Sequence, residues 1–155
     1  MNHPAQFMTF NQELAEKSGA SDFLQSGGAH ICTIKTAKCV TSNQKGTYGI
    51  EFSVVTSEGA KANYLKAYYA KSDNTPVPSG QSLINALMGF LNLPAISYTV
   101  QEIDGERCNA VPEFAEKKVG LFLEKVLYTK NDGGEGYRFN IRCPFDAQTK
   151  QTFKE

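Results

Sequence analysis

Residues 80–93, GQSLINALMGFLNL, are the one long stretch of the chain with helical periodicity, and their position decides the fold. The loop KSDNTPVPSG before them contains two prolines and a glycine, and Pro94 ends the segment. We therefore predict a single apolar helix over residues 80–92. Its apolar side chains recur at three- and four-residue spacings, which places them on one helix face: Leu83, Ile84, Leu87, Met88 and Leu91.

Three segments before this helix and two after it have the composition of β-strands. Residues 29–41 are rich in β-branched side chains, and residues 47–56 and 60–71 alternate between apolar and polar side chains with period two. The turn sequences SNQKG and SEG separate these three segments. Residues 117–130 and 136–145 are expected to form a closing hairpin around the glycine-rich turn NDGGEG.

The order of three strands, one helix and two strands predicts the OB-fold, a five-stranded Greek-key barrel with its helix between the third and fourth strands. A β-sandwich rarely places a lone apolar helix there, and a doubly wound α/β fold requires alternating strands and helices. We expect a mainly β protein with a lead-in over residues 1–27, a barrel domain over residues 28–146 and a tail over residues 147–155. Asn11 is the predicted N-cap of a short helix in the lead-in, and residues 95–116 are predicted to be an exposed acidic excursion.

The composition is that of a protein outside the membrane. The 155 residues are enough for one hydrophobic core, and no apolar run reaches the ~18 residues of a membrane span. The start, MNHPAQFMTFNQELAEK, lacks the basic and continuous apolar regions of a secretory signal. We therefore expect a cytoplasmic protein, without a cofactor or a bound metal. Four cysteines without a C-x-x-C pair indicate reduced thiols: Cys32, Cys39, Cys108 and Cys143.

The formal net charge of zero conceals a segregation of charge along the chain. Residues 28–71 carry a net charge of +4 and residues 117–145 carry +3. Residues 72–116, between them, carry −5. Two basic segments are therefore available to an anionic partner in spite of the neutral total.

Catalytic motifs are absent from the sequence, which has no G-x-S-x-G, no P-loop and no H-E-x-x-H. His30, at the start of the first strand, is more simply explained as a structural or exposed residue than as a base for Cys32. The carboxylates of QEIDGER could hold a hard cation, but a solvated turn explains them better. We therefore predict that the protein is not an enzyme.

One face of the third strand combines aromatic and basic side chains. Its other face, with Leu65, Ala67 and Tyr69, already supplies core side chains. Proteins that bind single strands need aromatic rings on which bases stack and cations near the backbone. The candidates on and beside this face are Lys61, Tyr64, Lys66, Tyr68 and Lys71.

The last strand carries two of the three arginines of the chain. In GYRFNIRC, Arg138 and Arg142 alternate with apolar side chains and therefore point away from the core. Guanidinium groups pair with phosphate and stack on bases. The alternative is that tyrosines and lysines here are ordinary strand and surface residues.

The chain resembles the small single-stranded DNA-binding proteins of bacteriophages and related mobile elements, which are OB-folds. The resemblance runs from about Ser26 to Phe145, in GTYGIEFSVVTSEG, SGQSLINALMGFLNLP and KKVGLFLEKVLYTKNDGGEGYRFNIRCPF. It implies a protein of the bacterial host cytoplasm that coats and protects single-stranded DNA, without sequence preference, during replication or recombination. The binding residues that it implies are Tyr64, Lys66, Tyr68, Arg138 and Arg142.

The partners implied are single-stranded DNA and proteins of replication or recombination, and no membrane. Stacking and phosphate contacts serve RNA as well as DNA, so RNA is left open, as is a homo-oligomer. A second hypothesis is a protein-binding adaptor or inhibitor, which would use the acidic residues 95–116 to cover a basic surface of another protein.

Overall fold

A computed structural model describes residues 5–16 and 23–153 of the chain. Residues 1–4 and 17–22 of the predicted lead-in, and residues 154–155, lie outside the described residues. The described elements are α1 (Gln12–Glu16), β1 (Gly28–Thr41), β2 (Tyr48–Thr56), β3 (Lys61–Ala70), α2 (Pro78–Phe90), β4 (Thr99–Ile103), β5 (Glu106–Ala110), the 3-10 helix η1 (Pro112–Phe114), β6 (Lys117–Thr129) and β7 (Glu135–Phe145).

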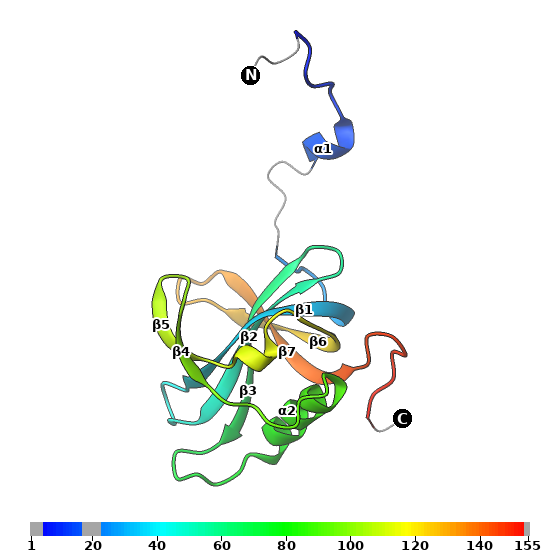
Figure 1. The fold of residues 1–155 in the computed structure, drawn as a ribbon. Helices are drawn as coiled ribbons and strands as arrows, with labels where there is room; N and C mark the ends of the chain where they lie inside the picture. The colour runs from blue at the N-terminus through cyan, green and yellow to red at the C-terminus, as the bar shows by residue number, and fades with distance from the viewer. Residues whose placement is uncertain (1–4, 17–22, 154–155) are drawn as a thin grey trace.

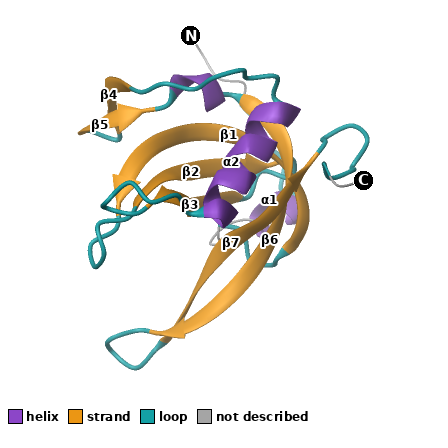
Figure 2. Ribbon diagram, turned by 90° about the horizontal axis from the view of Figure 1, so that it is seen from below, coloured by secondary structure: helices purple, strands orange, loops and turns teal. Residues whose placement is uncertain are grey.

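The strands form one antiparallel sheet with β1 at its centre (Figure 1). Along one edge β1 pairs with β2, which pairs in turn with β3. Along its other edge, the first half of β1 pairs with β6, and Lys38 pairs with Ala110 of β5. Beyond β1 the sheet therefore divides into two hairpins, β6–β7 and β4–β5, which project in different directions (Figure 2).

The core lies inside the curved sheet and under α2. Phe52 of β2 and Phe114 of η1 meet edge to face, with ring centroids 5.2 Å apart. Ile84 and Leu87 are the buried side chains of the predicted helix face. At Gly80 a Cβ atom would lie 1.6 Å from the carbonyl oxygen of Tyr68, so only glycine lets α2 begin directly against β3. The helix thereby lies across the sheet (Figure 2).

The predicted helix between the third and fourth predicted strands is confirmed, and it begins two residues earlier than residue 80. Pro78 explains the earlier start, because its fixed φ and missing N–H suit the first helical turn. The predicted cap of α1 is also confirmed, since the Leu14 N–H donates to Oδ1 of Asn11 at 3.2 Å. Among the described helices, not one is long and apolar enough to cross a membrane.

The sheet has seven described strands where the sequence predicts five. The additional pair, β4 and β5, falls in residues 95–116, which were expected to be an exposed excursion. Asp104 and Gly105 both have positive φ, and such a two-residue turn matches the twist of a hairpin. The outer strands β3 and β7 lie next to each other, but within residues 23–153 no ladder of hydrogen bonds joins them.

Candidate nucleic-acid interface

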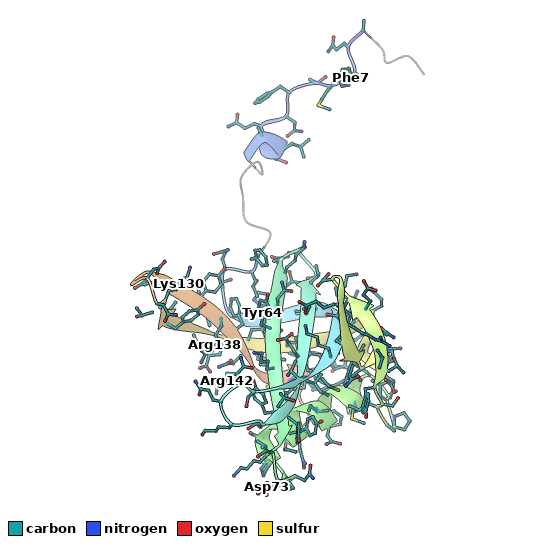
Figure 3. The ribbon with its side chains drawn as sticks, turned by 90° about the vertical axis from the view of Figure 1, so that its left-hand side faces the viewer. Phe7, Tyr64, Asp73, Lys130, Arg138 and Arg142 are labelled. Atoms are coloured by element: carbon teal, nitrogen blue, oxygen red, sulfur yellow. The ribbon has the colours of Figure 1, made fainter. Side chains whose placement is uncertain are left out.

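The predicted faces of β3 and β7 are confirmed. On β3, Leu65 is fully buried whereas the side chain of Tyr64 is 72% exposed. On β7, Phe139 is buried while Arg138 and Arg142 are exposed. Figure 3 shows Tyr64 and both arginines on the same side of the molecule, on neighbouring strands. Aromatic and cationic side chains from two distant parts of the sequence therefore meet on one surface.

Tyr64 projects from an irregular position in β3. Phe52 pairs with Leu65 and Val54 with Ala62, so two residues of β3, Asn63 and Tyr64, lie opposite one residue of β2. Such a bulge bends the strand and redirects a side chain. Tyr64 has φ of 62°, a left-handed conformation that is unusual for a bulky residue and costs of order 1–3 kcal/mol. The fold thus maintains an unfavourable backbone conformation that turns this ring toward solvent.

Beside Tyr64, β3 and β7 border a groove of about 430 Å³, which we call the Tyr64 groove. Lys61, Tyr64 and Arg138 all line it, so three of the predicted binding residues meet there. Tyr137 contributes a fixed wall, since its hydroxyl donates to the Leu24 carbonyl at 3.0 Å. Within the described part of the chain, neither Lys61 nor Arg138 has a carboxylate partner, so both cations are available to an anion.

The sequence interpretation did not assign several aromatic residues of the Tyr64 groove to a binding site, among them Tyr128 of β6. Tyr128 pairs with Gly136 across the hairpin, and its ring covers the position that a Cβ of Gly136 would take, at 2.6–2.8 Å. The glycine thus makes room for the tyrosine ring on the hairpin surface. The pairing could have been predicted by counting outward from the NDGGEG turn, because a hairpin aligns its strands from the turn.

Tyr68 lies in a different place from Tyr64. With Lys66 it lines a second groove, of about 460 Å³, against the β1–β2 loop with Lys45; we call this the Tyr68 groove. Tyr68 is half-buried, and its ring packs over Gly49, where a Cβ would lie 2.7 Å from the ring. The predicted pair of stacking rings is therefore split between two grooves, and Tyr68 also has a packing role.

Lys66 is not the free cation that the sequence interpretation assumed. The register places Lys38, Glu51 and Lys66 side by side across β1, β2 and β3. Glu51 Oε2 lies 3.4 Å from Lys38 Nζ, and Glu51 Oε1 lies 3.9 Å from Lys66 Nζ. One carboxylate thus lies between two ammonium groups, so the row contributes a single net positive charge.

The two remaining predicted cations are less central. Arg142 Nε lies 3.7 Å from Glu124 Oε2, an exposed pair of the kind that is worth about 0–1 kcal/mol. Lys71 belongs to the turn after β3, where its N–H donates to the Thr75 carbonyl. In Figure 3, Asp73 of that turn lies at the lower end of the sheet, below Tyr64 and far from Lys130, which precedes the β6–β7 turn. Lys71 is therefore placed away from the Tyr64 groove.

The other reactive side chains have structural surroundings. His30 Nε2 lies 3.0 Å from the Ser26 carbonyl oxygen, which fits the predicted structural role. Burial raises the pKa of the Cys32 thiol to about 12, so this group stays a thiol at neutral pH. Residues 5–16 and 23–153 contain no cluster of histidine, cysteine or carboxylate groups placed to hold a metal ion.

No protein-family model matches the chain, and no curated protein matches its sequence. The function is therefore inferred from the geometry of the two grooves and of the surface between them.

Proposed function

We propose that this protein is an OB-type module that binds single-stranded DNA without sequence preference and without catalysis, and that it coats and protects the strand during phage or mobile-element replication or recombination. The observation that carries the proposal is the Tyr64 groove, where Lys61, Tyr64 and Arg138 meet. An exposed ring beside two unpaired cations suits a base and its flanking phosphates.

The strand order supports the OB assignment within this proposal. Leaving out the β4–β5 hairpin, the strands run β3-β2-β1-β6-β7, with α2 between the third and fourth strands in sequence. OB-folds bind oligonucleotides on the face of strands 2 and 3 and on the loops at its two ends. The Tyr68 groove includes residues of the β1–β2 loop, and the Tyr64 groove is lined by β3 and by the strands β6 and β7, which supports the comparison.

The number of available cations indicates binding of moderate salt dependence. Lys61 and Arg138 are unpaired among the described residues, and Lys66 shares Glu51 with Lys38. Each phosphate contact on a single strand contributes a slope of about −0.7 in log K against log salt, so two to three contacts give a slope of about −1.4 to −2.1. Most of the affinity would then come from stacking, at roughly 1–3 kcal/mol per base.

A salt titration of a labelled oligothymidylate, followed by fluorescence anisotropy, tests the proposal. We expect binding at low salt that weakens with the shallow slope above, and weaker binding when Lys61 and Arg138 are both replaced by alanine. Lys150→Ala is the matched control, because Lys150 is exposed and lines neither groove. The absence of binding at low salt would refute the function, and an equal affinity for oligouridylate would extend it to RNA.

A further inference from the structure

The β4–β5 hairpin has a free backbone edge. Among the described strands, β4 pairs with β5 alone and is the last strand of its side of the sheet. Ile103 and Glu106 flank the two-residue turn and form the first pair of the ladder. Because antiparallel pairs alternate, the N–H and C=O groups of Val100 and Glu102 are directed away from β5. These main-chain groups are available to an additional strand.

The edge also lacks several of the features that protect exposed strands, although β4 is short and carries one charged residue, Glu102. Such edges are commonly blunted by lysine, proline or a bulge, and β4 has none of these in TVQEI. Instead, Val100 is 55% exposed, and Tyr98 just before the strand is 63% exposed. Both faces of β4 are open from Thr99 to Glu102. The hairpin therefore offers apolar surface beside its unpaired backbone.

The charge of the hairpin indicates what kind of strand it accepts. Residues 99–110 contain Glu102, Asp104 and Glu106 but only one basic residue, Arg107, and thus carry a net charge of −2. A second copy of this chain, paired edge to edge, would bring an equal negative charge against it. A basic segment would instead be attracted.

We propose that the outer edge of β4 is a docking site for an extended basic segment of a partner protein, which adds to the sheet as a further strand. Main-chain hydrogen bonds at Val100 and Glu102 hold the segment, Tyr98 and Val100 contact its apolar side chains, and the carboxylates select its lysines or arginines. The site lies on the β4–β5 hairpin, whereas the proposed DNA contacts lie on β3 and the β6–β7 hairpin, so it does not depend on DNA binding.

The test is a titration of the isotope-labelled full chain with an acetylated, amidated peptide that alternates lysine and valine. We expect amide shifts and slowed hydrogen exchange at Val100 and Glu102. Val100→Pro should weaken binding at least tenfold, because it removes an outward N–H that β5 does not use. Val100→Ala keeps that N–H and loses only part of one apolar contact, so it should weaken binding far less than Val100→Pro and is the comparison variant.

Two altered probes keep the test independent of how the variant folds. A peptide N-methylated at every residue has no N–H to donate along either of its edges and should bind at least tenfold more weakly, as should a peptide with glutamate in place of lysine. Shifts that map away from β4, equal binding of the acidic peptide, or no response at roughly 1 mM basic peptide would overturn the proposal. So would a dimer of the unaltered chain that Val100→Pro abolishes, since the occupant would then be a second copy.

Discussion

The two hairpins that pair with β1, β6–β7 and β4–β5, are both antiparallel but differ in net charge and in burial. The β6–β7 hairpin, residues 117–145, carries a net charge of +3 and buries one face with Leu121, Leu123 and Phe139. The β4–β5 hairpin carries −2, and Ala110 is its only buried residue. A hairpin anchored in the core can hold its outward arginines in fixed positions. A hairpin exposed on both faces instead presents unpaired main-chain groups and charged side chains to a partner.

This difference explains how a chain of zero net charge can suit an anionic ligand. The sheet places a net positive charge and a net negative charge on different hairpins. A phosphate proposed to bind near Arg138 therefore experiences the local positive charge and not the net charge of the whole chain. The acidic hairpin is nevertheless close to one end of that surface. Asp104 and Glu106 line a groove of about 570 Å³ together with Lys35, Lys61 and Tyr64. They form a boundary that phosphates are expected to avoid.

The largest expected effect is on stability, and it tests whether only one hairpin is anchored. Phe139→Ala removes a buried ring that meets Tyr137 at 5.7 Å between centroids, and it should lower the free energy of unfolding by about 3–5 kcal/mol. Val100→Ala should change it by less than about 0.5 kcal/mol. Urea unfolding measures both. Similar losses in the two variants would show that the β4–β5 hairpin is packed as firmly as the β6–β7 hairpin.

A matched pair of tyrosines tests which hairpin contacts a single strand. Tyr128→Ala should weaken oligothymidylate binding by about 1–3 kcal/mol, because its ring lines the Tyr64 groove. Tyr98→Ala should leave the affinity unchanged, although Tyr98 is the more exposed of the two. Fluorescence anisotropy at low salt gives both values. A larger effect at Tyr98 would place the bound strand on the acidic side of the molecule.

Two substitutions at the Tyr64 bulge distinguish the effect of the ring on binding from the effect of the backbone on stability. Tyr64→Gly and Tyr64→Ala should weaken oligonucleotide binding equally, by about 1–3 kcal/mol, since both remove the ring. Glycine accepts the positive φ at this position, so Tyr64→Gly should be more stable than Tyr64→Ala by about 1 kcal/mol. Thermal and urea unfolding of the two variants provide the comparison. If the alanine variant is the more stable one, the backbone of β3 is not strained at this residue.

The smallest expected effect is on the salt dependence, and it uses one arginine from each hairpin. Arg138→Gln should reduce the slope of log K against log salt by about 0.7, the value for one lost phosphate contact. Arg107→Gln on β5 should leave the slope unchanged, because its neighbours on the hairpin are carboxylates that repel phosphate. Anisotropy titrations at several salt concentrations measure both slopes. Equal changes in the two slopes would mean that the bound strand places phosphates beside both hairpins.

Tyr64 and Tyr68, which the sequence presents as one binding face, differ in how they pack. Tyr68 covers Gly49 and is half-buried, so its loss should destabilise the protein as well as weaken binding. The two tyrosines should therefore be replaced one at a time, with the unfolding free energy measured beside the affinity.

Most of the elements and their faces could be predicted from the sequence by itself. Periods of two and of about 3.6 residues are local properties, since each follows from the backbone geometry of a single strand or helix. They predicted the outward positions of Tyr64, Lys66, Arg138 and Arg142, and the apolar helix after the proline-rich loop. The Asp104-Gly105 turn was also visible, but its flanking segments are short and polar, so their pairing as β4 and β5 was not predicted.

Which of these side chains meet depends on how the strands pack in three dimensions. Lys61 and Arg138 are far apart in the sequence, and the curvature of the sheet that brings β3 beside β7 places them in one groove. The register across β1, β2 and β3 put Glu51 between Lys38 and Lys66, and a bulge turned Tyr64 away from Tyr68. Register and curvature arise from packing among several strands at once. The alternation pattern of a single strand therefore does not show which residue of the neighbouring strand, such as Glu51 or Gly136, lies beside a given side chain.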